Sequence, residues 1–346
     1  MKVNPKVFYS HVKKFNKNVS QIGELNSKKG LVTDDYEKTE ILSSQYASVW
    51  SVPRDHITSD DMLSFFGECN QCNQERVHIC KYDEVRDHII RYREHIMRIE
   101  PNAECGKLFK NPKILMVSHS YEDFQKAIIK ISSNAACGED GISANLLKRL
   151  SLPISKIIYK IFEKSLLEGQ FPKNLKHAII CGVYKSGDKG EAKNYRLIAL
   201  TSHISKVMEH VVRLDIVQYL DINQLWDIRQ HGSRAGRSTL SQLLEHQDMI
   251  INALEEGKNI DILYLDFAKA YDKVEISTLL YKMRSLGIMG NLGSWIGSFA
   301  LDRTQSVKIN NEKSMPVKVM SGIPQGSVLG PLLFLLFIQD LGINSE

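Results

Sequence analysis

At 346 residues the chain can fill about two domains, and its 43% hydrophobic and 25% charged residues are typical of a globular protein. The formal net charge of +5 permits a polyanionic partner without requiring one. The N-terminus has no apolar segment of signal-peptide length, the longest apolar run (LLFLLFI, 332–338) is too short to span a bilayer, and the six cysteines are scattered. We therefore expect an intracellular protein that is neither secreted nor held in a membrane.

The first 117 residues have helical patterns and no residue set that indicates catalysis. Asp34 and Glu37 have the spacing that caps a helix, which we expect to run to about Trp50. Residues 83–99 carry an apolar stripe with charges on the other faces, which predicts another helix. We expect both helices to pack against a larger domain.

One cluster in this part has the residue types of a zinc site. Cys69, Cys72, His78 and Cys80 form the pattern C-x2-C-x5-H-x-C, and cysteine and histidine are common zinc ligands. The single residue between His78 and Cys80 is awkward for tetrahedral ligation. An incidental grouping in a polar loop is therefore the favoured interpretation, with zinc as the alternative.

From residue 118 onward the signals of secondary structure become stronger. Ser120 is placed to cap a helix with an apolar stripe. Gly169 is a stop signal for the next helix, which begins at about Pro153. In chain order we expect a helix after Ser120, a helix from about Pro153 to Gly169, a strand at 177–184, and long amphipathic helices at 202–220 and 239–256.

The stretch DILYLDFAKAYDKV (261–274) has the pattern of a strand that ends in a carboxylate. In a strand, Ile262, Tyr264 and Asp266 face one way, and Asp272 follows six positions after Asp266. An aspartate at a strand end is often only the cap of the next helix, and for this motif alone that interpretation is the alternative. A helix with one apolar face is expected to follow, closed by Gly287.

The C-terminal part adds a hairpin and a glycine-rich turn. The hairpin is predicted by two strand-like segments, TQSVKI and MPVKVM, on either side of NNEK. The glycine-rich turn is SGIPQGSVLGP (321–331), and the helix after it is apolar on every side and must therefore be buried. Gly322 and Gly326 allow the backbone to come close to a ligand, where Gln325 offers both donors and an acceptor. A tight connection between elements would account for the glycines but not for the glutamine.

These segments occur together in an order that resembles the reverse transcriptases of non-LTR (LINE-type) retrotransposons, in particular the jockey-like group. The resemblance covers about residues 118–346, and more loosely the segment before. Seven blocks carry it: CGEDGI, FPKNLKHAIICGVYKSGD, NYRLIALTSHISKVMEHVV, QHGSRAGRST, LYLDFAKAYDKV, SWIGSFALDRTQSVKI and SGIPQGSVLGPLLFLLFIQDL.

The resemblance implies a fold, an activity and a set of partners. It implies an α+β fold, with the fingers and part of the palm of a right-hand polymerase at 118–346. Residues 1–117 would be a helical linker segment between an endonuclease domain and the polymerase. The implied activity is RNA-directed DNA polymerisation, with an RNA template, a DNA primer and dNTPs as partners and two Mg²⁺ ions, or Mn²⁺ in their place, as cofactors. Such a protein would act in the nucleus or in a cytoplasmic ribonucleoprotein particle.

The resemblance also implies roles for nine residues. Asp266 would be a catalytic metal ligand, assisted by the backbone carbonyl of Phe267. The ring of Tyr271 would exclude ribonucleotides, with ordinary core packing as the alternative. The other implied roles are a nucleotide pocket at Gln325 and Gly326, a grip on the triphosphate at Lys185 and Arg196, and contacts with template or primer phosphates at Arg234 and Arg237.

The largest departure from the family pattern is the lack of a strand with two adjacent aspartates after IQDL, together with the lack of the upstream endonuclease. One carboxylate does not hold two Mg²⁺ ions against hydration. We therefore expect a truncated domain that polymerises negligibly by itself and exposes an edge strand and an apolar surface. The alternative is a non-catalytic nucleic-acid-binding remnant of a retroelement. A purely structural helical protein would leave the ordered blocks unexplained.

Overall fold

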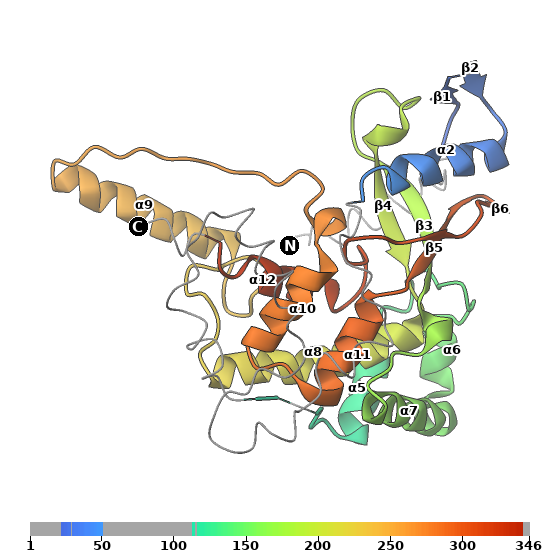
Figure 1. The fold of residues 1–346 in the computed structure, drawn as a ribbon, viewed down its shortest axis with the longest axis horizontal. Helices are drawn as coiled ribbons and strands as arrows, with labels where there is room; N and C mark the ends of the chain where they lie inside the picture. Colours follow the sequence, from blue (N-terminus) through green and yellow to red (C-terminus); the bar gives the residue numbers. More distant parts are fainter. Residues whose placement is uncertain (1–21, 29, 51–112, 115, 342–346) are drawn as a thin grey trace, which may run out of the picture.

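A computed structural model describes residues 22–28, 30–50, 113–114 and 116–341 (Figure 1). The helix expected at 83–99 and the cluster of Cys69, Cys72, His78 and Cys80 lie outside these residues. The elements are β1 (Leu25–Ser27), β2 (Gly30–Val32), α2 (Asp35–Ala47), α5 (Tyr121–Lys130), α6 (Ala144–Arg149), α7 (Ser151–Leu167), η2 (Lys173–Leu175), β3 (His177–Tyr184), η3 (Ala192–Asn194), β4 (Tyr195–Leu200), α8 (His203–Ile222), α9 (Thr239–Glu255), η4 (Ala270–Lys273), α10 (Ile276–Ser285), α11 (Gly290–Ala300), β5 (Thr304–Ile309), β6 (Glu312–Lys313), β7 (Val317–Lys318) and α12 (Gly330–Ile338).

A mixed sheet lies at one end of the molecule (Figure 1). Its central strand β3 pairs antiparallel with β4 and parallel with β5, and β5 pairs antiparallel with both β6 and β7. Ile180 of β3 lies opposite Ala199 on one side and Val307 on the other, and all three are buried. This row forms the centre of a small core that α2 covers with Leu42 and Tyr46. Residues before 118 thus share a core with the sheet, and the domain boundary expected there stays a prediction.

The larger core is helical and is formed by α5, α7, α8, α10, α11 and α12. At its centre the indole of Trp295 in α11 is fully buried, and its Nε1 donates a hydrogen bond to Ser165 Oγ at 3.0 Å. The rings of Phe162, Phe171 and Phe299 surround it at centroid distances of 5.1 to 6.3 Å. A bulky aromatic whose polar atom has a partner can be buried without a desolvation penalty, so this cluster holds α7 and α11 together.

The apolar helix α12 is held at its N-terminus by a carboxylate from a distant part of the chain. Glu209 of α8 is fully buried, and its Oε2 accepts hydrogen bonds from the backbone N–H groups of Val328 at 2.7 Å and Leu329 at 3.1 Å. Ser205 donates to its Oε1 at 2.6 Å. A carboxylate at a helix N-terminus accepts hydrogen bonds from the free N–H groups, and its negative charge interacts favourably with the helix dipole. Glu209 therefore fixes where α12 begins, directly after the glycine-rich turn.

Most elements expected from the sequence are confirmed. Asp34 caps α2 by accepting from Glu37 N at 2.9 Å, and Ser120 with Asp123 forms a capping box on α5. The strand expected at 177–184 has those bounds in β3, and the hairpin forms as β5 followed by the short strands β6 and β7. Helix α12 is buried as expected.

The prediction of a strand that ends at Asp266 is wrong. Residues 258–267 have no regular structure, and Figure 1 shows them as a long extended connection beside α9. Leu263, Tyr264 and Leu265 are 81%, 78% and 73% exposed. A strand exists only when a neighbour supplies hydrogen bonds, and none of the described residues supplies them to this segment. The alternating side chains are typical of a strand, but the neighbouring strand that would supply its hydrogen bonds is not among the described residues.

Helix α9 also differs from the expectation for an amphipathic helix. None of its residues is buried, and its apolar side chains are exposed: Leu240, Leu243, Leu244, Met249, Ile251 and Leu254. It contacts the extended connection where His246 Nε2 lies 3.0 Å from the hydroxyl of Tyr264. Within the described residues, no helix is both long and apolar enough to cross a membrane.

Candidate active site

The turn at 321–326 is fastened between two segments that are far apart in the sequence. Gly322 N donates to Val274 O at 2.8 Å, and Ile323 N donates to Tyr271 O at 3.0 Å. On the other side, Gln325 O accepts from Ala199 N, near the end of β4, at 2.8 Å. Three backbone hydrogen bonds thus set the position of Gln325 relative to the segment after Asp266 and to the sheet.

Both glycines of the turn are required by this close approach. Gly322 has φ +86°, and a Cβ there would lie 2.7 Å from Tyr271 O. Gly326 has φ +115°, and a Cβ there would lie 2.6 Å from Ala199 O. L-residues rarely adopt such φ values, and no Cβ is tolerated so close to a carbonyl oxygen. The close backbone approach expected toward a ligand is therefore made to the protein's own backbone.

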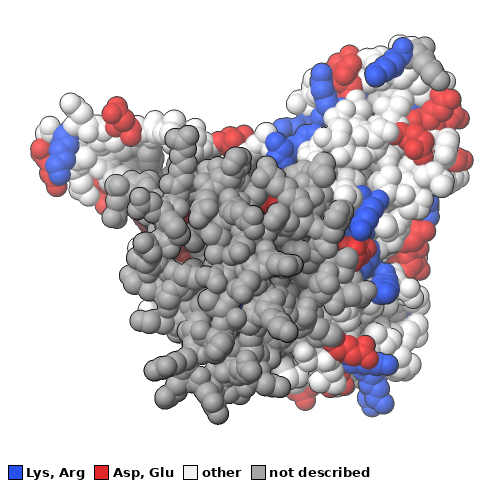
Figure 2. All heavy atoms as spheres, in the orientation of Figure 1, with Lys and Arg blue, Asp and Glu red and all other residues white. Residues whose placement is uncertain are grey.

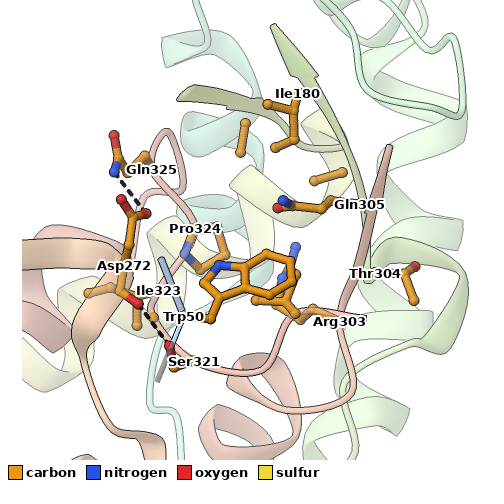
Figure 3. Close-up of a pocket in the computed structure, with 14 residues that line it drawn as sticks. Trp50, Ile180, Asp272, Arg303, Thr304, Gln305, Ser321, Ile323, Pro324 and Gln325 are labelled. Carbon is orange, nitrogen blue, oxygen red and sulfur yellow. Dashed lines mark hydrogen bonds between the residues drawn. The ribbon is translucent and has the colours of Figure 1, made fainter. Parts of the chain in front are cut away.

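The side chain of Gln325 has a specific partner. Its Nε2 donates to Asp272 Oδ1 at 3.0 Å, and Ser321 Oγ donates to the backbone carbonyl of Asp272 at 2.9 Å (Figure 3). Burial raises the pKa of Asp272, while the hydrogen bond from Gln325 and the charge of Lys269 act in the opposite direction. The sequence showed Asp272 six positions after Asp266 and gave no sign that it meets Gln325, since 53 residues separate them.

Tyr271 lies beside this pair and is partly buried. Its ring stacks on Phe334 of α12 with centroids 4.9 Å apart and an interplanar angle of 16°. Burial raises the pKa of its hydroxyl. One face of the ring is thus used for packing, so the sugar-selecting role and the packing role are compatible.

Asp266 and Phe267 are in a different setting. Both are exposed on the extended connection, and the carboxylate of Asp266 makes no hydrogen bond or ion pair with another described residue. A carboxylate and a backbone carbonyl are the hard oxygen donors that Mg²⁺ prefers, so these residues fit the metal in kind. They do not fit in number, since no three His, Cys, Asp or Glu side chains of the described ranges gather where they could hold a metal ion.

Lys185 and Arg196 lie together on the β3–β4 hairpin. Lys185 follows β3 directly and its N–H donates to Asn194 O at 2.9 Å, while Arg196 of β4 lies opposite Val183. Both side chains are exposed, and neither forms an ion pair with a described acid. On the described part of the face in Figure 2, charges of both signs are interspersed over the sheet lobe. The two cations are therefore available to a ligand.

Arg234 and Arg237, in contrast, already have protein partners. Arg234 Nη1 donates to Asp227 O at 3.1 Å, and its guanidinium lies 5.5 Å from the centroid of the Trp226 ring. Arg237 Nη1 donates to Glu245 Oε1 at 2.6 Å. A contact of either residue with template or primer phosphates would have to replace or share these interactions, and that role stays a prediction.

A small cavity is lined by Gln325 and Asp272 together with residues of β3, the start of β5 and the turn (Figure 3). It has a volume of about 40 Å³, which suits a few water molecules and not a nucleotide. Arg303 lines it and is only 2% exposed; its Nη1 donates to Phe299 O at 3.1 Å, and its Nη2 makes no hydrogen bond with a described residue. Burial lowers the pKa of Arg303 to about 10. Nothing in the sequence distinguished this arginine from an exposed one.

Comparison with known proteins places these features in a family. Residues 183–344 match the family described as reverse transcriptase (RNA-dependent DNA polymerase). The chain is 30% identical over 223 residues to the probable RNA-directed DNA polymerase from transposon BS and 32% identical over 219 residues to that from transposon X-element, both of Drosophila melanogaster. It is 29% identical over 221 residues to the RNA-directed DNA polymerase from mobile element jockey of the same species.

These alignments cover 62–64% of this chain and 24% of each relative, so the chain spans about a quarter of the length of the proteins it matches. The matched residues 183–344 include the turn at 321–326, the segment around Asp272 and the β3–β4 hairpin from residue 183 onward. Its mixture of helices and sheet is consistent with the α+β fold of polymerases. The chain therefore carries a reverse transcriptase domain of the non-LTR, LINE-type retrotransposons.

Proposed function

We propose that this domain synthesises DNA on an RNA template, as part of a larger retrotransposon protein that supplies the rest of the polymerase. The observation that supports this most is the fastening of the Pro324–Gln325–Gly326 turn between β4 and the Tyr271–Val274 segment. That arrangement brings an aromatic ring, an amide and a carboxylate together next to the segment that carries Asp266. An amide and a ring beside each other suit a nucleotide, which has both hydrogen-bonding groups and an apolar sugar face.

We assign the β3–β4 hairpin to the fingers, and η4, α10 and α12 to the palm. Lys185 and Arg196 on the hairpin would bind the triphosphate of an incoming dNTP, because exposed cations without protein partners can pair with phosphate at little cost. Gln325 and Gly326 would line the nucleotide pocket. The DNA primer and the RNA template would lie across the palm, with Arg234 and Arg237 at their phosphates.

Asp266, with the backbone carbonyl of Phe267, is the part of a Mg²⁺ or Mn²⁺ site that this domain would contribute. When bound, such ions stabilise charge on the attacking and leaving oxygens of a phosphoryl transfer. Among the described residues, Asp266 belongs to no group of three or more His, Cys, Asp or Glu side chains that could hold a metal ion. We therefore expect the 346-residue chain to polymerise negligibly by itself, because one carboxylate and one carbonyl leave the ions largely hydrated.

The test is primer extension by the full-length retrotransposon protein that contains this domain, with a primed RNA template, dNTPs and Mg²⁺. Asp266→Asn should lower the rate by more than about 100-fold, since even outer-shell partners of a metal ligand contribute 10–100-fold. Its thermal midpoint should not fall, because the side chain is exposed and without described partners. An Asp266→Asn protein that extends primers as fast as the wild type would overturn the proposal.

The exposed position of Asp266 favours one alternative, a domain that binds nucleic acid without extending it. Filter-binding assays combined with primer-extension assays distinguish DNA synthesis from binding alone. A remnant would bind RNA with a salt-dependent affinity, as phosphate contacts require, and would give no Asp266-dependent product even in the full-length protein.

A further inference from the structure

We propose that Asp272 is a positioning residue that holds the Gln325 amide in one orientation, with its oxygen presented to the incoming nucleotide. This inference rests on the proposed polymerase function. It concerns a residue for which the sequence pattern indicated no role.

The first step is the chemistry of the hydrogen bond between the two side chains. A glutamine amide has a donor end and an acceptor end of nearly equal size, so an unpartnered amide can rotate between two orientations. An ionised carboxylate accepts only. Because Asp272 Oδ1 lies 3.0 Å from Gln325 Nε2, it selects the orientation in which the NH₂ group faces Asp272. The amide oxygen, Oε1, then points away from Asp272.

The second step is that both ends of this hydrogen bond are mounted on fixed backbone. Asp272 N donates to Lys269 O at 3.1 Å, and Asp272 O accepts from Ser321 Oγ at 2.9 Å. Gln325 O accepts from Ala199 N at 2.8 Å. With both backbones held, the remaining freedom is the rotation of the two side chains, and the hydrogen bond between them restricts it. Fixing an acceptor before the ligand arrives lowers the entropy cost of binding.

The third step identifies the group that the oxygen would meet. Oε1 needs a hydrogen-bond donor from the nucleotide. The bases offer donors at different positions, whereas the 3′-hydroxyl of the sugar is a donor that all four dNTPs share. Tyr271, proposed to contact the sugar, directly precedes Asp272 in the sequence. The 3′-hydroxyl is therefore the substrate group that an acceptor fixed by Asp272 would recognise.

The experiment is steady-state primer extension by the full-length protein with Asp272→Ala, Asp272→Asn, Gln325→Ala and the Asp272→Ala/Gln325→Ala double variant. Asp272→Ala should raise the KM for dNTPs by about 10-fold with a smaller change in kcat, the size expected for one charge-assisted hydrogen bond. Asp272→Asn, which keeps an acceptor oxygen, should restore most of the loss. In the Gln325→Ala background, Asp272→Ala should cause no further change in KM.

A second readout separates positioning from a merely structural role. The preference for dNTPs over 3′-deoxynucleotides should fall in Asp272→Ala to the level of Gln325→Ala. Ser321→Ala is the matched structural control, because it removes a hydrogen bond to the backbone of Asp272 and leaves the carboxylate–amide contact in place. It should keep the wild-type ratio of dNTP to 3′-deoxynucleotide use.

Two results would overturn the inference. The first is that Asp272→Ala raises the KM for dNTPs by the same factor in the wild-type and in the Gln325→Ala protein. The second is that Asp272→Ala leaves the preference for dNTPs over 3′-deoxynucleotides unchanged. If Asp272→Ala does not fold, Asp272→Leu and Gln325→Ala are compared by the same ratio, and a difference between them contradicts the inference. An inactive Asp266→Asn protein together with additive Asp272 effects would reject this inference alone. Wild-type activity in Asp266→Asn would reject the proposed function itself.

Discussion

The turn at 321–326 and the connection at 258–267 carry the two halves of the proposed active site, and they are built in opposite ways. The turn has backbone hydrogen bonds on both sides, glycines where a Cβ would collide with carbonyl oxygens, and a buried helix directly behind it. The connection is extended, exposed and without regular structure, and α9 beside it buries none of its residues. The comparison indicates that contacts within the described residues fix the turn, whereas they leave the connection exposed and without regular structure.

The largest expected effect comes from the carboxylate behind the turn. Glu209→Ala would remove the hydrogen-bond partner of the part-buried N–H group of Val328 and of the buried N–H group of Leu329, and a buried group left unsatisfied costs about 1–3 kcal/mol. We expect a loss of about 3–5 kcal/mol in the free energy of unfolding, measured by urea denaturation. Ser238→Ala, which removes the N-cap of the exposed helix α9, is the matched change and should cost about 1 kcal/mol. Equal losses would contradict the contrast between the two regions.

Glycine substitutions sharpen the same comparison. Gly326→Ala would place a Cβ 2.6 Å from Ala199 O at φ +115°, and we expect it to cost about 3 kcal/mol and to move Gln325. Gly257→Ala, just after α9, has φ +69° and no atom within 4 Å of the added Cβ, so only the backbone strain of about 1 kcal/mol applies. Thermal melts of both variants measure the difference. A Gly326→Ala protein as stable as Gly257→Ala would show that the turn is not tightly held.

A third prediction concerns Tyr271, whose ring stacks on Phe334 of the buried helix α12 behind the turn. In an active full-length protein, Tyr271→Val should ease ribonucleotide incorporation by about 10-fold or more relative to dNTPs, because the ring no longer crowds the 2′-hydroxyl. Single-nucleotide extension with matched rNTP and dNTP pairs measures the ratio. Phe334→Leu is the control that loosens the packing and leaves the tyrosine in place. Unchanged sugar discrimination in Tyr271→Val would mean that the ring only packs.

The smallest effect on stability is expected on α9. Leu243 and Leu244 are each 58% exposed, so changing both to Gln should alter the free energy of unfolding by less than about 0.5 kcal/mol. Leu279→Ala in α10 is fully buried and should cost about 2–5 kcal/mol. Exposed apolar patches promote association, so the α9 variant should also sediment more uniformly than the wild-type chain, which we expect to be poorly soluble. An unfolded α9 variant would mean that this face is covered by something outside the described residues.

Much of this fold was predictable because its signals are local. The caps at Asp34 and Ser120 and the all-apolar helix after Gly330 each depend on residues within a few positions of one another. The strand at 177–184 was predicted from its own segment and is formed because β4 and β5 lie beside it. The strand before Asp266 was not predictable in the same way. Its alternating side chains are visible in the sequence, but a strand requires a neighbour, and the sequence of one segment does not specify whether that neighbour is present.

The candidate site divides along the same line. Asp266, Tyr271, Gln325 and the two cations of the β3–β4 hairpin were predicted as site residues from ordered motifs, and their roles stay predictions. The link between Asp272 and Gln325, the buried charge of Arg303 and the cap from Glu209 were missed, because each depends on residues brought together across the fold.

The sequence by itself determined the family, the order of the elements and the residue types that polymerase chemistry needs. Spacing, caps and turn glycines carry that information, since they act over a few bonds. Only the tertiary structure decided which of those residues meet, because a hydrogen bond such as that between Asp272 and Gln325 forms when two backbones 53 residues apart are fixed at the right separation. It also decided that the segment around Asp266 stays exposed, since strand formation depends on a partner and not on the pattern alone.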